Sequence, residues 1–222
     1  MLPRIILHNE ISVDGRIDWI TPDIGLFYEL ASRWKEDATL AGSNTILKQE
    51  EEMPEEDEEA FEPPVKNSGD SRPLLVVPDS KGRVRKWHAL RKIGYWRDVV
   101  VLCSHSTPGT YLDYLKKRHI DYIVAGDNYV DLKAALEELN ARYGIRLVRV
   151  DSGGTLNGVL LRAGMVDEIS VLINPSLVGG TSPRSFFRAP DLNLPEGIIK
   201  LKFIHFEIIK DDIIWLRYKV VQ

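Results

Sequence analysis

Short runs rich in valine, isoleucine and leucine alternate along most of this chain with segments whose apolar residues recur at helical spacing. This order is typical of a mostly parallel sheet covered by helices on both faces, because neighbouring parallel strands must be joined by a crossover. The sequence therefore predicts a three-layer α/β fold. Strands are expected at Arg4–Ser12, Ala38–Ala41, Leu74–Pro78, Val99–Cys103, Tyr122–Ala125, Leu147–Val150 and Glu168–Asn174.

Amphipathic helices are expected in three of the connections between these strands. One begins near Asp131 and stops at Gly144, and an acidic residue and a glycine are favoured at these two ends of a helix. A second covers Pro22–Trp34, with Thr21 as its N-cap, since proline is favoured at the first helical position. A third covers Tyr111–His119.

The C-terminal part of the chain has a different pattern. Two further apolar runs, Ile199–Ile209 and Ile213–Val221, are separated only by the polar residues 210–212. Such a short polar connection is typical of a hairpin turn. The sheet is therefore expected to end in an antiparallel hairpin.

An acidic run interrupts the regular order of strands and helices. Residues 50–62 contain nine Asp and Glu and neither Lys nor Arg, so the rest of the chain is mildly basic although the net charge is −4. Such a run repels itself and can bury little apolar area. It is predicted to be a solvated loop inserted at about residues 49–71 of a single domain spanning 1–222. A plain surface excursion is favoured over a regulatory role.

The composition excludes several kinds of partner. With 44% hydrophobic and 28% charged residues, the chain is expected to be an ordinary globular protein with a buried core. No stretch approaches the roughly 20 apolar residues of a membrane span, and no signal segment is evident, so a cytoplasmic protein without membrane contact is expected. The basic body suits a small anionic ligand, but no basic run or zinc-finger spacing indicates nucleic acid. Cys103, the one cysteine, ends an apolar run and is expected to be inert, and no metal site is predicted.

A glycine turn follows the predicted strand that ends at Val150. The turn is Ser152–Thr155, with paired glycines in its middle, and an amphipathic segment follows it. Glycines allow a ligand to approach the backbone closely, and the free amides at the start of a helix favour a phosphate. The alternative is a tight turn without a ligand. The full fingerprint of a dinucleotide-binding or phosphate-binding loop is missing, which disfavours an ordinary Rossmann dehydrogenase and a phosphate-loop nucleotidase.

A second strand runs through a small glycine turn into a helix start. This turn contains Gly42 and Thr45. In open parallel sheets, ligands bind at the carboxyl ends of the strands, so the two turns are expected to flank one crevice.

The first predicted strand carries three polar side chains on one face. His8, Glu10 and Ser12 are spaced two residues apart, and alternate residues of a strand point the same way. Burying them against a helix without partners would be costly. Either this face opens into a cleft, which is favoured, or the groups bond one another.

An ordered series of motifs resembles a known family. From about residue 4 to 220 the chain is similar to the riboflavin-biosynthesis pyrimidine reductases, which share the dihydrofolate-reductase fold. The acidic run is the main stretch without a counterpart. The resemblance implies a central sheet, a bound NADPH and a homodimer. The motifs are Ser12–Ile17, Asp37 with Gly42 and Thr45, Val76–Ser80, Gly153–Gly158, Val166–Glu168 and Pro175–Gly180.

The resemblance also implies which residues bind the ligands. Arg33 is expected to contact the phosphate of the substrate, although an exposed cation at a helix end is the alternative. Asp151 and Ser152 lie on the substrate side, and Arg83 and Arg85 are candidates for the additional 2′-phosphate of NADPH. The implied cofactor contacts are Trp19, Gly42, Thr45, Asp79, Ser80, Gly153, Gly154, Thr155, Leu156, Asn157 and Gly158.

The implied reaction reduces the ribosylamino group of a 2,5-diamino-pyrimidinone ribosyl phosphate to ribitylamino, with NADPH becoming NADP+. It needs an acid or base to open the sugar ring. Many relatives carry Glu directly before the paired glycines, where this chain has Ser152, so Glu10 or Asp151 could supply the carboxylate. His8 stands where some relatives have Lys, and His8 and Glu10 are expected to be the catalytic pair. One cysteine excludes the zinc site of the deaminase in bifunctional relatives, so the chain resembles the stand-alone archaeal and fungal enzymes.

Two other functions stay open at this point. One is a dihydrofolate reductase or another pterin reductase with the same fold, although Arg33 and the basic body fit a phosphorylated substrate better. The other is a non-catalytic nucleotide-binding relative, which the departure at Ser152 leaves possible.

Overall fold

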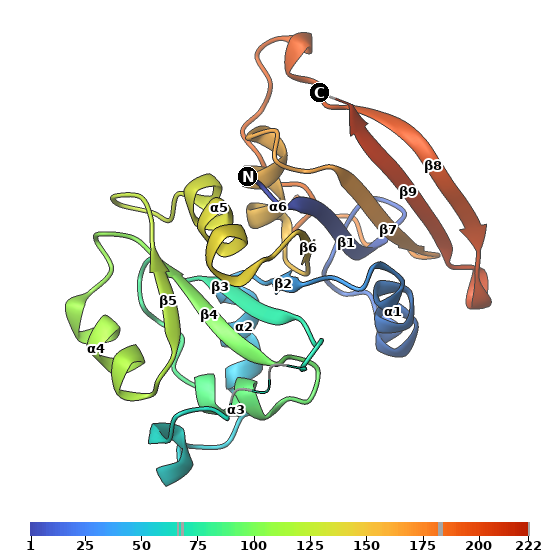
Figure 1. Cartoon of the computed structure of the whole chain (residues 1–222). Coiled ribbons are helices and arrows are strands. Elements are labelled where there is room, and N and C mark those ends of the chain that lie inside the picture. Colours follow the sequence, from blue (N-terminus) through green and yellow to red (C-terminus); the bar gives the residue numbers. More distant parts are fainter. Residues whose placement is uncertain (66, 68, 182–183, 222) are drawn as a thin grey trace. The chain divides into compact units, whose positions relative to one another are not determined.

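The computed structural model describes residues 1–65, 67, 69–181 and 184–221 (Figure 1). These residues form two compact units. The first unit combines Met1–Pro3 with Glu36–Val148, and the second combines Arg4–Lys35 with Arg149–Gln222. None of the described helices is long and apolar enough to cross a membrane.

The first unit contains parallel strands in the order β5-β4-β3-β2. These strands are nearly continuous apolar runs, as expected for parallel strands that are buried on both faces. Apolar side chains of α2, α3 and α4 share one core with odd-numbered residues of β3 and β4. The elements are β2 (Ala38–Leu40), α2 (Ser43–Glu50), β3 (Leu74–Pro78), α3 (Trp87–Lys92), β4 (Asp98–Cys103), α4 (Gly109–Lys117), β5 (Asp121–Val124) and α5 (Leu132–Tyr143).

The second unit is built around β1, which pairs in parallel with β7; β9 then pairs antiparallel with β7, and β8 antiparallel with β9. The last two residues of β6 also belong to this unit, on the other side of β1. Its helices are α1 and α6. The bounds are β1 (Arg4–Ser12), α1 (Ile24–Ala31), β6 (Leu147–Val150), α6 (Gly154–Arg162), β7 (Glu168–Asn174), β8 (Lys200–Ile208) and β9 (Ile214–Val221).

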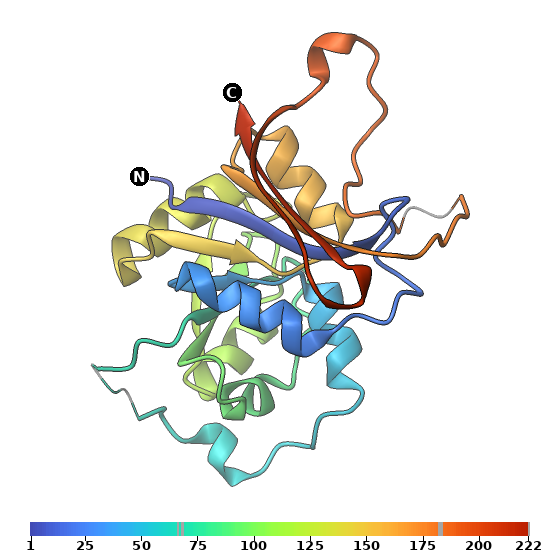
Figure 2. The same cartoon turned by 90° about the vertical axis from the view of Figure 1, so that its right-hand side faces the viewer.

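Helices cover both faces of β1. His8 bonds the backbone of Phe27 in α1, and the next residue, Asn9, bonds Asn157 in α6. Since successive strand residues point to opposite faces, α1 and α6 lie on opposite sides of this strand (Figure 2). The mostly parallel α/β class with a C-terminal antiparallel hairpin is therefore confirmed.

The predicted helix after the first strand is shorter than expected. It begins at Ile24 and ends at Ala31, and a single 3-10 turn, Ser32–Trp34, follows it. Its N-cap is Asp23 rather than Thr21, because the Asp23 Oδ1 accepts the Leu26 N–H at 2.9 Å. The prediction of Thr21 as the cap was wrong.

Two other helices show how local and distant signals differ. Helix α5 is capped by Asp131 and ends in the left-handed residue Gly144, as predicted. Helix α3 was not expected, since six residues are too few to show a helical period. Its Trp87 is fully buried, so tertiary packing stabilises it.

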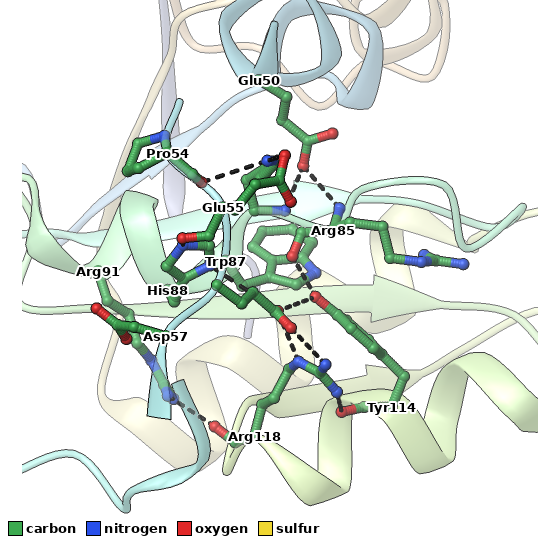
Figure 3. Close-up of polar contacts among 12 residues, drawn as sticks. Glu50, Pro54, Glu55, Asp57, Arg85, Trp87, His88, Arg91, Tyr114 and Arg118 are labelled. Carbon is green, nitrogen blue, oxygen red and sulfur yellow. Dashed lines mark hydrogen bonds and ion pairs between the residues drawn. The ribbon is translucent and has the colours of Figure 1, made fainter. Parts of the chain in front are cut away.

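The acidic segment, residues 50–62, is paired with bases of the first unit instead of being solvated alone (Figure 3). Glu56 accepts from the Arg118 Nε at 2.7 Å, and the Lys92 Nζ lies 3.0 Å from the Asp57 Oδ2. Lys92 belongs to α3 and Arg118 directly follows α4. Both bases are far from the acidic segment in the sequence, so the sequence of the segment alone could not predict these ion pairs. Of the predicted loop at 49–71, Lys66 and Ser68 lie outside the described residues. That this loop is an insertion in a single domain stays a prediction.

Candidate functional site

The glycine turn after β6 starts helix α6, as predicted. Gly153 is the N-cap, with extended backbone (φ −81°, ψ 172°), and no side chain caps the helix. Thr155 is exposed at this end. The first amides of α6 are therefore not used by a capping side chain, which is the arrangement that favours an anion.

Gly154 and Gly158 are required by a close contact within the second unit. A Cβ on Gly154 would lie 1.9 Å from the Ser185 carbonyl oxygen, and one on Gly158 would lie 1.8 Å from the Arg188 carbonyl oxygen. The Arg188 N–H also donates to the Gly154 carbonyl at 3.0 Å. At these two positions, glycine permits the close approach of another segment of this chain. Their predicted contact with a cofactor stays a prediction.

Asn157 links the glycine turn to β1. It is fully buried, and its Nδ2 donates to the Asn9 Oδ1 and to the Phe186 carbonyl, both at 2.9 Å. The Asn9 Nδ2 in turn donates to the Ser152 carbonyl at 2.8 Å. This geometry supports a structural role for the Asn157 side chain rather than direct contact with a cofactor. Asn9 was not predicted from the sequence. It could have been found as a polar residue on the face of β1 opposite His8.

Two of the sequence motifs meet at Asp14. Its carboxylate accepts from the Ser12 hydroxyl at 2.6 Å and from the backbone N–H of Val178 and Gly179 at 3.1 and 2.6 Å. These bonds, that of Ser12 first, lower the pKa of Asp14 to about 2. Ser12 also accepts the Arg16 N–H at 2.9 Å. Ser12 is therefore part of a turn and does not face a cleft.

His8 lies in a chain of hydrogen bonds inside the second unit. The Phe27 carbonyl can only accept, so the His8 Nε2 at 3.2 Å donates to it, and Nδ1 of the neutral ring accepts from the Ser170 hydroxyl at 3.0 Å. Ser170 accepts in turn from the Trp215 indole at 2.8 Å. Both ring nitrogens are used, and the side chain is fully buried. The expectation that this face of β1 opens into a cleft is wrong at His8.

Burial keeps the His8 ring neutral. Desolvation, and next the positive charge of Arg149, lower the pKa of His8 from 6.5 to about 3. With this pKa the ring is neutral near pH 7, so it lacks the acidic proton of an imidazolium and is a weak base. The structure therefore does not support proton transfer by His8. Glu10 is the other member of the predicted pair.

We expect His8 to make the protein less stable as the pH falls. Its pKa is lower in the folded state, so between pH 6.5 and about 3 the unfolded chain binds a proton that the folded chain does not. In this range His8 removes about 1.4 kcal/mol of unfolding free energy for each pH unit of acidification. Urea unfolding at pH 7, 6 and 5 should show a smaller slope for His8→Gln than for the wild type. Equal slopes would contradict this assignment.

Glu10 carries a buried carboxyl group. It is 7% exposed, its Oε1 accepts from the Asn174 Nδ2 at 3.1 Å, and its Oε2 is buried without a hydrogen-bond partner among the described residues. Burial raises the pKa of Glu10, although the Asn174 bond acts in the opposite direction. A carboxyl group of this kind keeps its proton to higher pH than an exposed glutamate.

Asp151 lies beside two donors. Its Oδ2 is 3.4 Å from the Tyr28 hydroxyl and 3.5 Å from Arg149 Nη1. Arg149 is fully buried, and its guanidinium lies 5.9 and 5.7 Å from the rings of Phe27 and Tyr28. Sequence reasoning missed Arg149, whose signal was a charged residue within an apolar strand. Next to Asp151, Ser152 is buried and its carbonyl is bonded to Asn9.

Trp19 and Arg33 are exposed in the second unit. Trp19 is 84% exposed and has φ of 65°, a left-handed conformation that is unusual for a bulky residue. Such a backbone is often found at ligand-binding positions. Arg33 lies in the 3-10 turn after α1, with its guanidinium 4.9 Å from the Trp215 ring centroid.

Leu156 lies in α6 of the second unit, and the remaining predicted cofactor residues lie in the first unit. Gly42 is the N-cap of α2, which no side chain caps, and Thr45 lies in the first turn of that helix. At the same end the Arg83 guanidinium donates to the Ser43 hydroxyl at 3.1 Å and to the Asn44 Oδ1 at 2.8 Å. A basic side chain and a helix start without a side-chain cap are thus brought together here.

Asp79 and Ser80 shape the loop that carries Arg83. The buried Asp79 Oδ2 accepts the Arg83 N–H at 2.6 Å and the Val84 N–H at 2.9 Å. The Ser80 hydroxyl oxygen accepts the Val130 N–H at 3.0 Å. Both side chains are engaged within the protein, so their predicted contacts with a cofactor stay predictions. Among the described residues, no group of three His, Cys, Asp or Glu could hold a metal ion.

Comparisons with known proteins show the family of this chain. The family model of the RibD C-terminal domain matches residues 3–215. The 2,5-diamino-6-ribosylamino-4(3H)-pyrimidinone 5′-phosphate reductase of Methanothermobacter thermautotrophicus is 30% identical, over 96% of this chain and 97% of its own length. A protein with the same name from Archaeoglobus fulgidus is 29% identical over 81% of this chain and 84% of its own length.

Solved structures show the same fold. The riboflavin biosynthesis reductase of Saccharomyces cerevisiae matches with a TM-score of 0.67 and 20% identity, covering 99% of this chain and 90% of that one. RibD of Acinetobacter baumannii matches with a TM-score of 0.70 and 19% identity, covering 99% of this chain and 58% of that one. The predicted dihydrofolate-reductase-like fold is thereby confirmed.

Proposed function

The chain belongs to the RibD C-terminal domain family, and we propose that it is an NADPH-dependent reductase of 2,5-diamino-6-ribosylamino-4(3H)-pyrimidinone 5′-phosphate. The observation that carries this proposal is the similarity to the archaeal reductase of that name, which extends over nearly the full length of both chains. The reaction converts the ribosylamino group to ribitylamino. The cofactor, when bound, supplies the hydride for the first carbon of the sugar.

Each unit, taken by itself, contains one helix start that suits a phosphate. In the second unit this is the start of α6, where the amides of Gly154 and Thr155 are not capped by a side chain. In the first unit it is the start of α2, where Arg83 adds a forked cation that suits the 2′-phosphate. Arg85 suits this role less well, because its guanidinium stacks 4.7 Å over the Tyr111 ring and donates to the Gly82 carbonyl.

Glu10 is the proton donor in this proposal. Opening the ribose ring requires a proton on the ring oxygen, and a buried carboxyl group, which keeps its proton to higher pH than an exposed one, is suited to donate it. Asp151, beside the Tyr28 hydroxyl and Arg149, is suited to accept hydrogen bonds from the substrate as a carboxylate. Arg33, exposed in the 3-10 turn, binds the phosphate of the substrate.

A homodimer is part of the proposal and is supported by β8. This strand lies at the edge of the second unit. Exposed apolar edge strands are normally covered by a partner, since they otherwise favour aggregation. Its exposed apolar residues are Leu201, Phe203, Ile204, Phe206 and Ile208.

The function is tested directly by turnover. Purified protein with NADPH and the diamino-pyrimidinone ribosyl phosphate should oxidise the cofactor and form a product that is heavier by two hydrogen atoms. Dihydrofolate in a parallel reaction should give no oxidation above background. Turnover of dihydrofolate instead would assign a pterin reductase. Binding of NADPH without oxidation in either reaction would assign a non-catalytic nucleotide-binding protein.

A further inference from the structure

The loop from Asp79 to Lys86 is fastened by a carboxylate near each end. At its start, the Asp79 carboxylate holds the backbone N–H groups of Arg83 and Val84. At its end, the Oε1 of Glu50 accepts the N–H groups of Arg85 and Lys86 at 2.6 and 2.7 Å (Figure 3). The side chain of Arg83 therefore extends from a backbone that is fixed on both sides.

Helix α2 contacts this loop at both of its ends. Its first residues, Ser43 and Asn44, accept from the Arg83 guanidinium, and its last residue is Glu50. If the loop end at Arg85 moved, Arg83 would therefore move with it, and its position relative to the start of α2 would change. Glu50 is thus in contact with the loop without contacting the Arg83 side chain itself.

The middle of the loop leaves little room for rearrangement. Gly82 has φ of +60°, and a Cβ there would lie 2.6 Å from the Tyr111 ring. Arg85 closes over the same ring, with its guanidinium 4.7 Å from the centroid. Lys86, at the loop end, donates through Nζ to the Pro54 carbonyl at 3.3 Å and pairs with Glu55. The acidic segment thus holds the end of the loop by backbone and side chain together.

We propose that Glu50 is a positioning residue for cofactor selectivity. By holding the Arg85 and Lys86 amides, it keeps Arg83 at the start of α2, where the guanidinium selects a nucleotide with a 2′-phosphate. This inference rests on the proposed use of Arg83. Holding a binding group in place before the ligand arrives lowers the entropic cost of binding, so the loss of Glu50 weakens the Arg83 contact without removing Arg83.

The test compares the binding of NADP+ and NAD+ by calorimetry. For Glu50→Ala, the Kd for NADP+ should rise about tenfold, and the Kd for NAD+ should stay within about twofold. Glu50→Gln keeps an acceptor for the two amides without its charge and should give a smaller rise, about threefold. Glu51→Gln, the same change at the exposed neighbouring residue, is the matched control and should leave both values unchanged.

A purely structural role of Glu50 would give a different result. It would lower the melting temperature and weaken NADP+ and NAD+ binding equally, and that outcome would overturn the proposal. Wild-type affinity for NADP+ in both Glu50 variants would also overturn it. Arg83→Ala tests the role of Arg83 separately from that of Glu50, since it should abolish the preference for NADP+. If Arg83→Ala has no effect, the role of Arg83 is wrong and the role of Glu50 falls with it. Turnover is not needed for this test, so failure of the proposed reaction would be seen separately.

Discussion

Replacing Glu10 by glutamine is expected to lower kcat by about 10²-fold or more and to leave the Kd for NADPH within about threefold. Glutamine has nearly the same shape, and it can still accept the Asn174 bond, but it has no carboxyl proton to donate. The measurement is steady-state kinetics with the diamino-pyrimidinone ribosyl phosphate, together with a binding titration of NADPH.

The pH dependence of kcat/KM tests the role of Glu10 independently. Because burial raises the pKa of Glu10, the protonated form persists to higher pH than in an exposed glutamate. In the wild type, kcat/KM should fall as the pH rises through this raised pKa, and in Glu10→Gln this limb should be absent. A limb that persists in the variant would assign the proton to another group.

Two further variants serve as comparisons for Glu10→Gln. Glu29→Gln makes the same change at an exposed position of α1 and should leave turnover unchanged. Asp151→Asn tests the other candidate carboxylate. Loss of turnover in Asp151→Asn with normal turnover in Glu10→Gln would reverse the assignment of the two acids.

Replacing Gly154 by alanine is expected to destabilise the protein by about 3 kcal/mol or more. The added Cβ would overlap the Ser185 carbonyl oxygen, a backbone atom that cannot turn away as a flexible side chain can. For a chain of this size, such a loss lowers the melting temperature by about 6–12 °C. Gly158→Ala should behave similarly, because its Cβ would overlap the Arg188 carbonyl. Thermal unfolding followed by circular dichroism measures both.

Gly153→Ala is the matched control for this prediction. Gly153 adjoins Gly154 and has a backbone that alanine can adopt, and its Cβ would meet only the Ile17 Cδ1 at 3.4 Å. It should change stability by less than about 1 kcal/mol. Equal melting temperatures for Gly153→Ala and Gly154→Ala would show that the contact between α6 and the Ser185 segment is absent in solution.

Local sequence pattern was enough to predict the strands and some of the helix ends. The bounds of β1 and β7 agree with the prediction, because isoleucine and other aliphatic residues recur along each run. Helix α5 was predicted at both ends, since its N-cap aspartate and C-terminal glycine act within a few residues of the chain. Helix α3 was missed because it is short, and the carboxylate at its start belongs to Glu50, far away in the sequence.

The sequence also determined which residue types stand near each glycine turn, and the family to which they belong. Only the tertiary structure decided what each side chain does there. His8 and Glu10 share one face of one strand, and nothing local distinguishes them. The Phe27 carbonyl and Ser170 satisfy the histidine and keep it neutral, whereas Asn174 satisfies only one oxygen of the glutamate. Protonation depends on burial and on hydrogen bonds from distant segments, and these exist only once the chain has folded.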